Sequence, residues 1–456
     1  SSLEVVGGPT RLFLGSNLPL QYVEYGSPFR IDQPIYFALS CGRPPSVDSA
    51  PATELALQRT VRGWRAWAQT TALPSFAPDA VLRSALCLKL HAFSDSGAII
   101  AAATTSLPEA LGSTRTWDYR YCWLRDAAFV VEALRRLSQL SEGEAFVRFL
   151  RDMADAGPLQ PVYGVGGERQ LDEAILPHLR GYDEVGPVRI GNAAYLQTQH
   201  DLPGEMVLCL ETMLSDPRIV NEDRTVGPLL ERLVAEAIAR SQEPDTGLWE
   251  YRTNPRHYTF SKAMCWVAAH RGAQLAGSLG MHERASEWNA WADTERVRVL
   301  QHAYNEELGF FTHTLGGEFP DASNLLLPTI GIVDATDPRF RSTVRAYERL
   351  LAEDGLMLRY RHPDDFGETT SAFSICSFWW VEALAMMGEV DAAVALFNRL
   401  QTFANPLGLF SEDIEPKTGR LLGNFPQAYT HVGVIHAAIT IGEILDARHG
   451  TFRAWS

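Results

Sequence analysis

Hydrophobic and polar positions follow two different patterns along the chain, and the change falls near residue 50. Before that point, the short β-rich runs TRLFLG, LQYVEYG and IYFALSCG are separated by Gly and Pro, which is typical of strands joined by turns. The run GRPPSVDSAPA (Gly42–Ala52) then predicts a linker. The pattern therefore predicts a β-rich N-terminal segment over residues 1–50 and a second domain over residues 51–456.

Beyond residue 50 the apolar positions recur at the spacing of helix faces. In CWLRDAAFVVEALRRLSQL, the residues Leu124, Ala127, Val131 and Leu134 fall on one face. Comparable runs continue to the C-terminus and are separated by long loops rich in Trp, Tyr, Arg, Asp and Glu. Long loops in a compact domain are often functional, and the helices have no fixed residue period, which disfavours a solenoid. The pattern favours an α-barrel or toroid made of helix hairpins.

Composition narrows the possible partners. The formal net charge of -15 argues against nucleic acid and against an anionic membrane surface, because both attract clustered Lys and Arg. No secretory signal is visible, and no apolar run is evidently long enough to span a bilayer. The six cysteines are scattered without a C-x-x-C pair, which predicts buried free thiols in a reducing compartment. A cytoplasmic location without membrane association is expected.

Several common chemistries lack their motifs. The chain contains no G-x-x-x-x-G-K-[ST], no H-E-x-x-H and no G-x-S-x-G, so nucleotide, zinc and α/β-hydrolase chemistry is poorly supported. Neither a cofactor nor a metal is expected. The loops instead combine carboxylates with aromatic residues, which suits glycoside hydrolysis by one protonated and one ionised carboxyl group.

Two loop segments supply candidate sugar-binding residues. In TRTWDYRYCWLRDAAF, Arg125 and Asp126 stand at a predicted helix start, where Asp could also merely complement the helix dipole. The four aromatic residues just upstream favour a sugar pocket. In GYDEVGPVRIGNAAYLQTQHDLPGE, Arg189 and Asn192 could bind hydroxyl groups, and an ordered surface loop is the alternative.

Glu250 stands between Trp249 and Tyr251 in GLWEYRTNPRHYTFSKAMCW, with several cations close behind. An aromatic wall raises a carboxyl pKa by desolvation, whereas a nearby cation lowers it. If Glu250 is an acid, Arg252 and Arg256 are expected to point away from it, and its carboxyl group should face a cavity.

Glu412 lies in GLFSEDIEPKTGRLLGNFPQAYTH, followed directly by Asp413. Composition alone would favour an exposed acidic turn for this segment. As the second carboxylate of a glycosidase, Glu412 would instead lie opposite Glu250.

These segments resemble glycoside hydrolase family 15, which contains glucoamylases, glucodextranases and bacterial trehalases. WDYRYCWLRDAAF, PVRIGNAAYLQTQ, GLWEYRTNPRHYTFSKAMCW, DASNLLLP, CSFWWVEALA and SEDIEPKTGRLLGNFPQAYTHVGVIHAA occur in the order of the family's bacterial branch, from about residue 30 to 450. The resemblance implies a mainly α protein, an (α/α)6 barrel preceded by a β-sandwich, of which residues 1–50 would be an incomplete part. It also implies exo-acting hydrolysis of a small α-glucoside or oligosaccharide with inversion, releasing β-glucose from the non-reducing end.

The resemblance assigns roles to individual residues. Glu250 matches the general acid and Glu412 the general base, while Arg125 and Asp126 match the pair that holds the terminal glucose. Further matching sugar-binding positions are Tyr119, Trp123, Trp249, Arg359 and Tyr360. Inversion requires the two catalytic carboxyl groups to be about 6.5–9.5 Å apart. Where relatives often have Glu-Gly-Ala-Phe before the CSFW helix, this chain has Thr370 in place of Glu.

Three alternatives to a glucoamylase or α-glucosidase remain open. An α,α-trehalase belongs to the same family, and its sequence pattern does not differ in an obvious way. A non-catalytic sugar-binding protein on this scaffold is disfavoured by the retained pair Glu250 and Glu412. An inverting phosphorylase would use phosphate in place of water and would not need Glu412 as a base.

Overall fold

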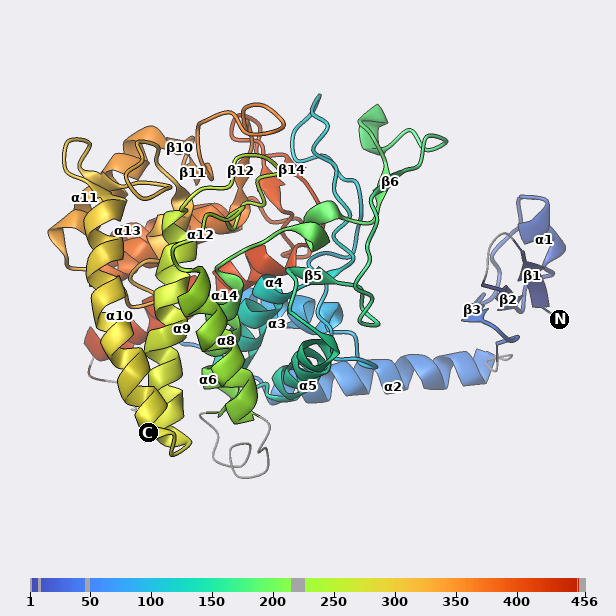
Figure 1. Cartoon of the computed structure of the whole chain (residues 1–456). Helices are drawn as coiled ribbons and strands as arrows, with labels where there is room; N and C mark the ends of the chain where they lie inside the picture. The colour runs from blue at the N-terminus through green and yellow to red at the C-terminus, as the bar shows by residue number, and fades with distance from the viewer. Residues whose placement is uncertain (1, 7–9, 46–49, 215–225, 449, 451–456) are drawn as a thin grey trace. The chain divides into compact units, whose positions relative to one another are not determined.

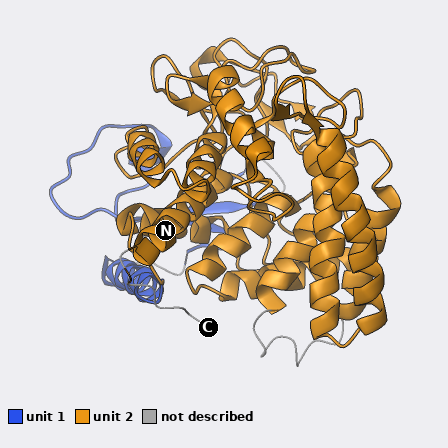
Figure 2. Ribbon diagram, turned by 90° about the vertical axis from the view of Figure 1, so that its left-hand side faces the viewer, with its two compact units in different colours: residues 1–71 blue, residues 72–456 orange. Residues whose placement is uncertain are grey.

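The computed structural model describes residues 2–6, 10–45, 50–214, 226–448 and 450 (Figure 1). The chain divides into two compact units, residues 1–71 and residues 72–456 (Figure 2). The boundary lies after Thr71, so the helix over residues 50–69 belongs to unit 1, whereas the sequence pattern placed it in the helical domain. Each unit is described by itself.

Unit 1 contains a three-stranded antiparallel sheet in the order β1-β2-β3. Its elements are β1 (Ser2–Val5), β2 (Leu12–Ser16), α1 (Gln21–Glu24), β3 (Phe37–Cys41) and α2 (Ala50–Gln69). The predicted strand LQYVEYG is wrong, because its backbone forms the single helical turn α1. The amides of Val23 and Glu24 both bond to the carbonyl of Leu20. That this sheet is part of a β-sandwich stays a prediction.

Unit 2 is built around a closed ring of six helical segments, each of which contacts the next. In ring order these inner segments are α4 (Leu124–Arg136), α6 (Leu202–Leu214), α9 (Thr259–Ser278), η3 (Ala322–Leu326), α12 (Ser374–Met386) and α14 (Ala428–Arg448). Inner helices are apolar on nearly every side, as expected of helices without a solvent-facing side. In α12, for example, every residue from Ser374 to Trp379 is buried.

Within the described residues, six further helices lie outside this ring and alternate with the inner segments along the chain. They are α3 (Pro78–His91), α5 (Ser141–Ala156), α8 (Val226–Arg240), α10 (His282–Ala303), α11 (Pro338–Leu350) and α13 (Val390–Gln401). Outer helices are amphipathic. In α11, Phe340, Val344 and Tyr347 are buried, while Arg341 and Arg345 on the other side are exposed. Among the described residues, this double ring confirms the predicted (α/α)6 barrel.

Helix α14 corrects one expectation from the sequence. It is 21 residues long and apolar enough, by length and composition, to cross a membrane. Within the barrel, however, 78% of its most apolar window is buried. Its position in the inner ring therefore accounts for its composition.

Long loops precede the inner segments and meet at the end of the barrel that is uppermost in Figure 1. Short antiparallel pairs form within and between these loops. They are β4 (Cys122–Trp123) with β5 (Val162–Tyr163), β6 (Ala174–Ile175) with β7 (Arg189–Ile190), β8 (Tyr304–Asn305) with β9 (Phe310–Phe311), β10 (Ala352–Glu353) with β11 (Leu356–Met357), and β12 (Ala372–Phe373) with β13 (Asp413–Ile414) and β14 (Leu421–Leu422). The β4–β5 pair links the loops before α4 and α6, and the β12–β13 pair links those before α12 and α14. The N-terminal ends of the inner helices are thus held together around one region.

Candidate active site

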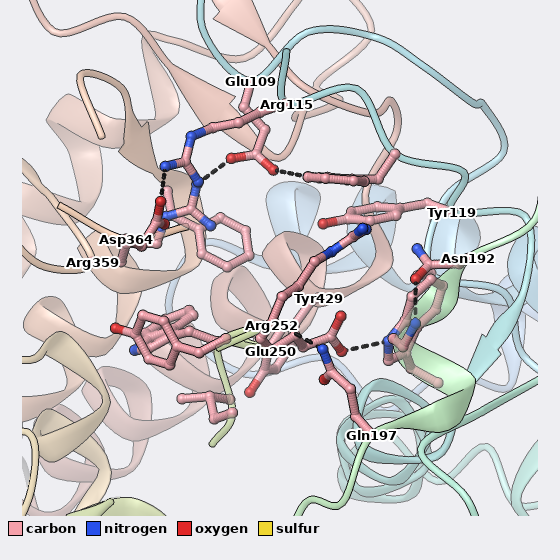
Figure 3. Close-up of a pocket in the computed structure, with 18 of the residues that line it drawn as sticks. Glu109, Arg115, Tyr119, Asn192, Gln197, Glu250, Arg252, Arg359, Asp364 and Tyr429 are labelled. Carbon is pink, nitrogen blue, oxygen red and sulfur yellow. Dashed lines mark hydrogen bonds and ion pairs between the residues drawn. The ribbon is translucent and has the colours of Figure 1, made fainter. Parts of the chain in front are cut away.

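A cavity of about 890 Å³, open solvent included, lies among the loops at this end of unit 2 (Figure 3). Eight of the ten predicted site residues line it: Tyr119, Trp123, Arg125, Asp126, Trp249, Glu250, Arg359 and Tyr360. The other two, Arg189 and Glu412, lie outside its lining. The sequence therefore located the cavity correctly but not every member of its wall.

Glu250 presents its carboxyl group to the cavity from the loop before α9. Its Oε1 accepts hydrogen bonds from Trp123 Nε1 at 2.6 Å, Arg125 Nη2 at 3.2 Å and Gln199 Nε2 at 3.4 Å. All hydrogen bonds described for its side chain reach Oε1, and 24% of the side chain stays exposed. Oε2 is therefore the oxygen that can carry a proton into the cavity.

The backbone and the charge state of Glu250 are both unusual. Its φ angle is 61°, a left-handed conformation that costs a non-glycine residue energy and often occurs at active sites. Burial raises the pKa of Glu250, and the Arg125 guanidinium opposes this shift most strongly. Burial thus favours the protonated form that a general acid needs.

The cations next to Glu250 in sequence point elsewhere, as predicted. Arg252 donates from Nη2 to Glu173 Oε2 at 2.8 Å, and Arg256 does not line the cavity. The cation that does reach Glu250 is Arg125, which the sequence analysis had assigned to sugar binding alone.

Lys262 is a further cation in the segment that follows Glu250. The buried ammonium group donates to the carbonyls of Arg240 and Glu243 and approaches His200 Nδ1 at 3.3 Å. Since α8 ends at Arg240, Lys262 caps the C-terminus of that helix, where a cation is favoured. Its role is structural and it fixes the start of the loop that carries Glu250.

Glu412 lies behind the cavity wall and has no exposed surface. Tyr119 Oη donates to its Oε1 at 2.6 Å, and the backbone amide of Asn424 donates to Oε2 at 3.2 Å. A Cβ at Gly423, where φ is +72°, would lie 2.7 Å from the Glu412 Cβ, so only glycine fits there. The alternative of an exposed acidic turn is wrong.

Burial raises the pKa of Glu412 well above its ordinary value, and the carboxylates of Glu109 and Asp413 raise it further. The hydrogen bond from Tyr119 and the charge of Arg359 favour the ionised form and act in the opposite direction. Tyr119 therefore connects Glu412 to the cavity, and its hydrogen bond lowers the pKa of Glu412.

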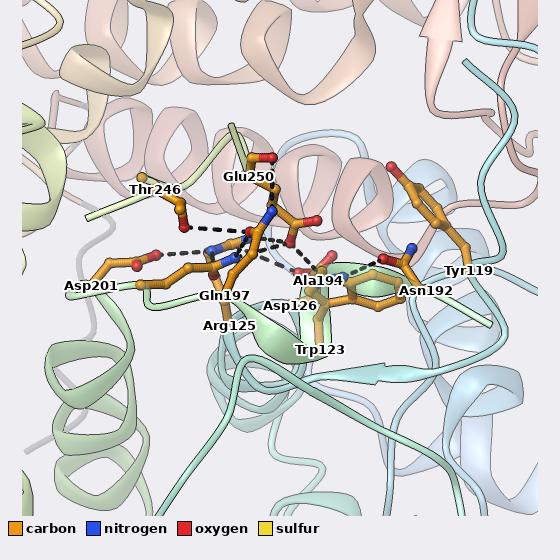
Figure 4. A network of polar contacts seen from close by, with 12 residues as sticks. Tyr119, Trp123, Arg125, Asp126, Asn192, Ala194, Gln197, Asp201, Thr246 and Glu250 are labelled. Atoms are coloured by element: carbon orange, nitrogen blue, oxygen red, sulfur yellow. Dashed lines mark hydrogen bonds and ion pairs between the residues drawn. The ribbon is translucent and has the colours of Figure 1, made fainter. Parts of the chain in front are cut away.

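One short segment, residues 119–123, donates hydrogen bonds to both glutamates. Tyr119 and Trp123 pack edge to face, with ring centroids 5.3 Å apart. Tyr119 donates to Glu412, and Trp123 donates to Glu250. Figure 4 shows Tyr119, Trp123 and Glu250 in this network. The separation of the two carboxyl groups stays a prediction of about 6.5–9.5 Å.

Arg125 and Asp126 occupy the first turn of α4 and both line the cavity. Burial raises the pKa of Asp126 to about 6, and Arg125 opposes this shift. The Arg125 side chain is fixed from the loop before α6, because Nη1 donates to Gln199 Oε1 at 2.8 Å and to Asp201 Oδ2 at 2.9 Å (Figure 4). Arg125 thus connects the sugar-binding pair to Glu250.

The far wall of the cavity contains residues that the sequence analysis missed. Glu109 Oε1 accepts from Trp117 Nε1 at 2.8 Å, and Glu109 Oε2 is paired with Arg359. Tyr360 Oη donates to Asp364 Oδ2 at 2.5 Å. Glu109 stands only a few residues before the first aromatic-rich segment, in SLPEALGSTRTW, and that neighbourhood was the available signal.

Arg189 and Trp249 have structural contacts that the sequence did not show. Arg189 Nη1 donates to the carbonyls of Thr114 at 2.8 Å and Thr116 at 3.0 Å, so Arg189 joins two loops and does not line the cavity. Trp249 lines the cavity and donates to Asp321 Oδ2 at 2.8 Å.

The thiols were only partly predicted. All six cysteines are free, and five of them are buried, whereas Cys41 is exposed. Among the described residues, no group of three or more His, Cys, Asp and Glu side chains could hold a metal ion.

Comparison with known families identifies the scaffold. A model of the family described as "Glycosyl hydrolases family 15" matches residues 75–439, which is most of the chain. The chain belongs to glycosyl hydrolase family 15.

Curated members of family 15 show substantial identity to this chain. It is 44% identical to a trehalase of Mycobacterium tuberculosis over 416 residues, which cover 89% of this chain and 61% of that protein. Identity to a trehalase of Mycolicibacterium smegmatis is 42%, covering 89% and 62%. The chain thus spans about three fifths of the length of these relatives.

Solved glucoamylase structures share the fold at low identity. A bacterial glucoamylase complexed with acarbose gives a TM-score of 0.70 at 15% identity, covering 98% of this chain and 74% of that one. The glucoamylase of Saccharomycopsis fibuligera gives a TM-score of 0.60 at 13% identity, covering 80% of this chain and 94% of that one. Identities this low show the fold alone.

Proposed function

We propose that this family 15 chain hydrolyses α,α-trehalose with inversion. The support is the 44% identity to a protein named trehalase. The glucoamylase likeness lies at 15% identity and concerns the fold only. The trehalase alternative therefore has better support than the glucoamylase expectation drawn from the sequence.

The observation that carries a hydrolytic function is a pair of hydrogen bonds from neighbouring aromatic residues to two carboxyl groups. Tyr119 donates to the buried Glu412, and Trp123 donates to the half-buried Glu250. In the proposed reaction, Arg125 and Asp126 bind hydroxyl groups of one glucosyl ring. Glu250 donates its proton to the glycosidic oxygen as the bond from that oxygen to C1 breaks. Glu412 accepts a proton from water, whose oxygen bonds to C1 from the opposite face.

The stereochemistry of the products tests this proposal. Inversion at one anomeric carbon of α,α-trehalose gives one β-glucose and one α-glucose, whereas retention would give two molecules of α-glucose. In H₂¹⁸O, proton NMR and mass spectrometry of the first-formed sugars should show equal anomers, with ¹⁸O only in β-glucose. Two α-glucose products would contradict inversion.

A disaccharide panel tests the choice of substrate. Trehalose should release glucose faster than maltose, isomaltose, kojibiose and nigerose in phosphate-free buffer. Faster cleavage of another member would replace trehalose as the substrate. A strict requirement for phosphate would indicate a phosphorylase, and no release from any member would contradict the proposed hydrolysis of a disaccharide.

Two conservative variants should move opposite limbs of the pH profile. Tyr119→Phe removes a donor that lowers the pKa of Glu412, so the acidic limb of kcat/KM should move to higher pH. Trp123→Phe removes a donor that lowers the pKa of Glu250, so the alkaline limb should move to higher pH. Each shift should be about one pH unit, given the usual strength of hydrogen bonds to charged groups. Movement of the same limb by both variants would contradict the assigned roles.

A further inference from the structure

The exposed rim of the cavity consists of two residues that bind each other. Among the residues that line the cavity, Arg252 and Asp365 are the exposed ones. The Arg252 amide donates to Asp365 Oδ2 at 2.6 Å. The loop that carries Glu250 is therefore joined at the rim to the loop before α12.

The Arg252 side chain extends this connection to two further loops. Its Nη2 donates to Glu173 Oε2 at 2.8 Å, in the loop before α6. Its guanidinium carbon lies 4.7 Å from the centroid of the Trp117 ring, in the loop before α4, and 5.2 Å from that of Phe366. These five residues, Trp117, Glu173, Arg252, Asp365 and Phe366, are here called the rim clasp.

The rim clasp belongs to the cavity and not to the core of the barrel. Trp117, Arg252, Asp365 and Phe366 all line the cavity, and Figure 3 labels Arg252 among the lining residues. Partly exposed ion pairs and cation–π contacts each contribute little to stability. Several of them on one rigid, planar guanidinium can nevertheless fix where four loops meet.

The position of Arg252 relates the rim clasp to the leaving group. Arg252 follows Glu250 by two residues, so their Cα atoms are at most about 7 Å apart. A leaving sugar that takes a proton from Glu250 must lie next to that acid, and therefore close to the rim. A further sugar unit on this ring would have to pass the clasp.

We propose that the rim clasp limits the substrate to a leaving group of one sugar ring and that Arg252 determines this specificity. The inference rests on the proposed glycosidase function and deepens it. Disaccharides should be cleaved in preference to the trisaccharide in which one more glucose extends the leaving ring.

The test compares these two sugars in the full-length chain. For trehalose, the longer substrate carries an α-1,4-linked glucose on one ring. Release of α-maltose with β-glucose reports cleavage with the longer leaving group, because inverting cleavage from the other side would give β-maltose with α-glucose. Wild type should prefer the disaccharide. Arg252→Ala should reduce the ratio of kcat/KM for the disaccharide to kcat/KM for the trisaccharide at least tenfold. Glu173→Gln should reduce the same ratio by a smaller factor. Arg256→Ala is the matched control, because it removes an arginine from the same loop outside the cavity, and should leave the ratio unchanged.

Several outcomes would overturn the rim clasp. One is equal cleavage of both sugars by the wild type. Another is an unchanged ratio of kcat/KM values in Arg252→Ala and Glu173→Gln, and this includes a fall of both kcat/KM values by the same factor. If Arg252→Ala does not fold, Glu173→Gln decides alone. If wild type cleaves neither sugar, the proposed function fails. The ratio of the binding constants for the disaccharide and the trisaccharide, measured by tryptophan fluorescence, then tests the rim clasp separately.

Discussion

Glu412→Gln is expected to lower kcat by roughly 10²–10⁴-fold while changing KM little, because a positioned general base contributes about this much to a hydrolytic rate. Glutamine has nearly the same shape and its amide oxygen can still accept the hydrogen bond from Tyr119, so only the bond from the Asn424 amide is lost. What it cannot do is accept a proton from water. Steady-state kinetics on the preferred disaccharide measure the loss.

Glu415→Gln provides the control for this variant, since it makes the same change in the same loop at a residue that does not line the cavity. It should retain normal turnover. A second variant, Glu412→Ala with added azide, should form β-glucosyl azide, because the small anion can attack without a base. Near-normal turnover of Glu412→Gln would remove Glu412 from the base role and leave Glu109 as the next candidate.

The structure gives a reason to rank Glu412 above Glu109. Glu109 lines the cavity, but its Oε2 is paired with the cationic Arg359. Both donors to Glu412, the Tyr119 hydroxyl and the Asn424 amide, are instead neutral. Glu412 accepts from Tyr119, which itself lines the cavity, and so has a direct connection to it. A large loss of kcat in Glu109→Gln, with normal kcat in Glu412→Gln, would reverse this ranking.

The helical part of the fold could be predicted because its pattern is local. The three- and four-residue spacing of apolar positions marks helices whether they lie inside or outside the ring. One inner segment of the ring was not visible in the spacing, since η3, over Ala322–Leu326, is too short to show a helical period. In unit 1, LQYVEYG looked like a strand because single-turn helices have no periodicity to detect.

Some predicted site residues that are neighbours in sequence also share the wall of the cavity. Trp249 and Glu250 are adjacent in the chain and both line the cavity. The charge acting on Glu250 was missed because its source, Arg125, lies 125 residues earlier. The local sequence instead indicates Arg252 and Arg256 as the cations nearest to Glu250. Contacts between loops arise from barrel closure, and no local pattern encodes them.

Arg189 illustrates the opposite error. Its sequence context, polar and glycine-rich, suited a sugar-binding loop, yet its guanidinium is used to hold carbonyls of the neighbouring loop. An arginine with five donors serves either purpose equally well, so residue type alone could not decide.

Glu250→Gln should also lower kcat on the natural disaccharide by roughly 10²–10⁴-fold, but its loss should depend on the leaving group. A sugar leaves poorly without a proton, whereas fluoride needs none. The variant should therefore retain much of its activity on α-glucosyl fluoride, and Glu412→Gln should not. The remaining pH profile should also lose its alkaline limb, because that limb reports deprotonation of Glu250, whose pKa is raised by burial.

The comparison between the two substrates separates acid catalysis from simple damage to the cavity. Glu250 sits in a left-handed conformation and bonds to Trp123 and Arg125, so its replacement could disturb all three side chains. Such a disturbance would lower activity on the disaccharide and the fluoride alike. Glu243→Gln, an exposed change in the same loop, should affect neither. Equal losses on both substrates would therefore assign Glu250 to binding, and only a loss confined to the poor leaving group is consistent with a proton donor.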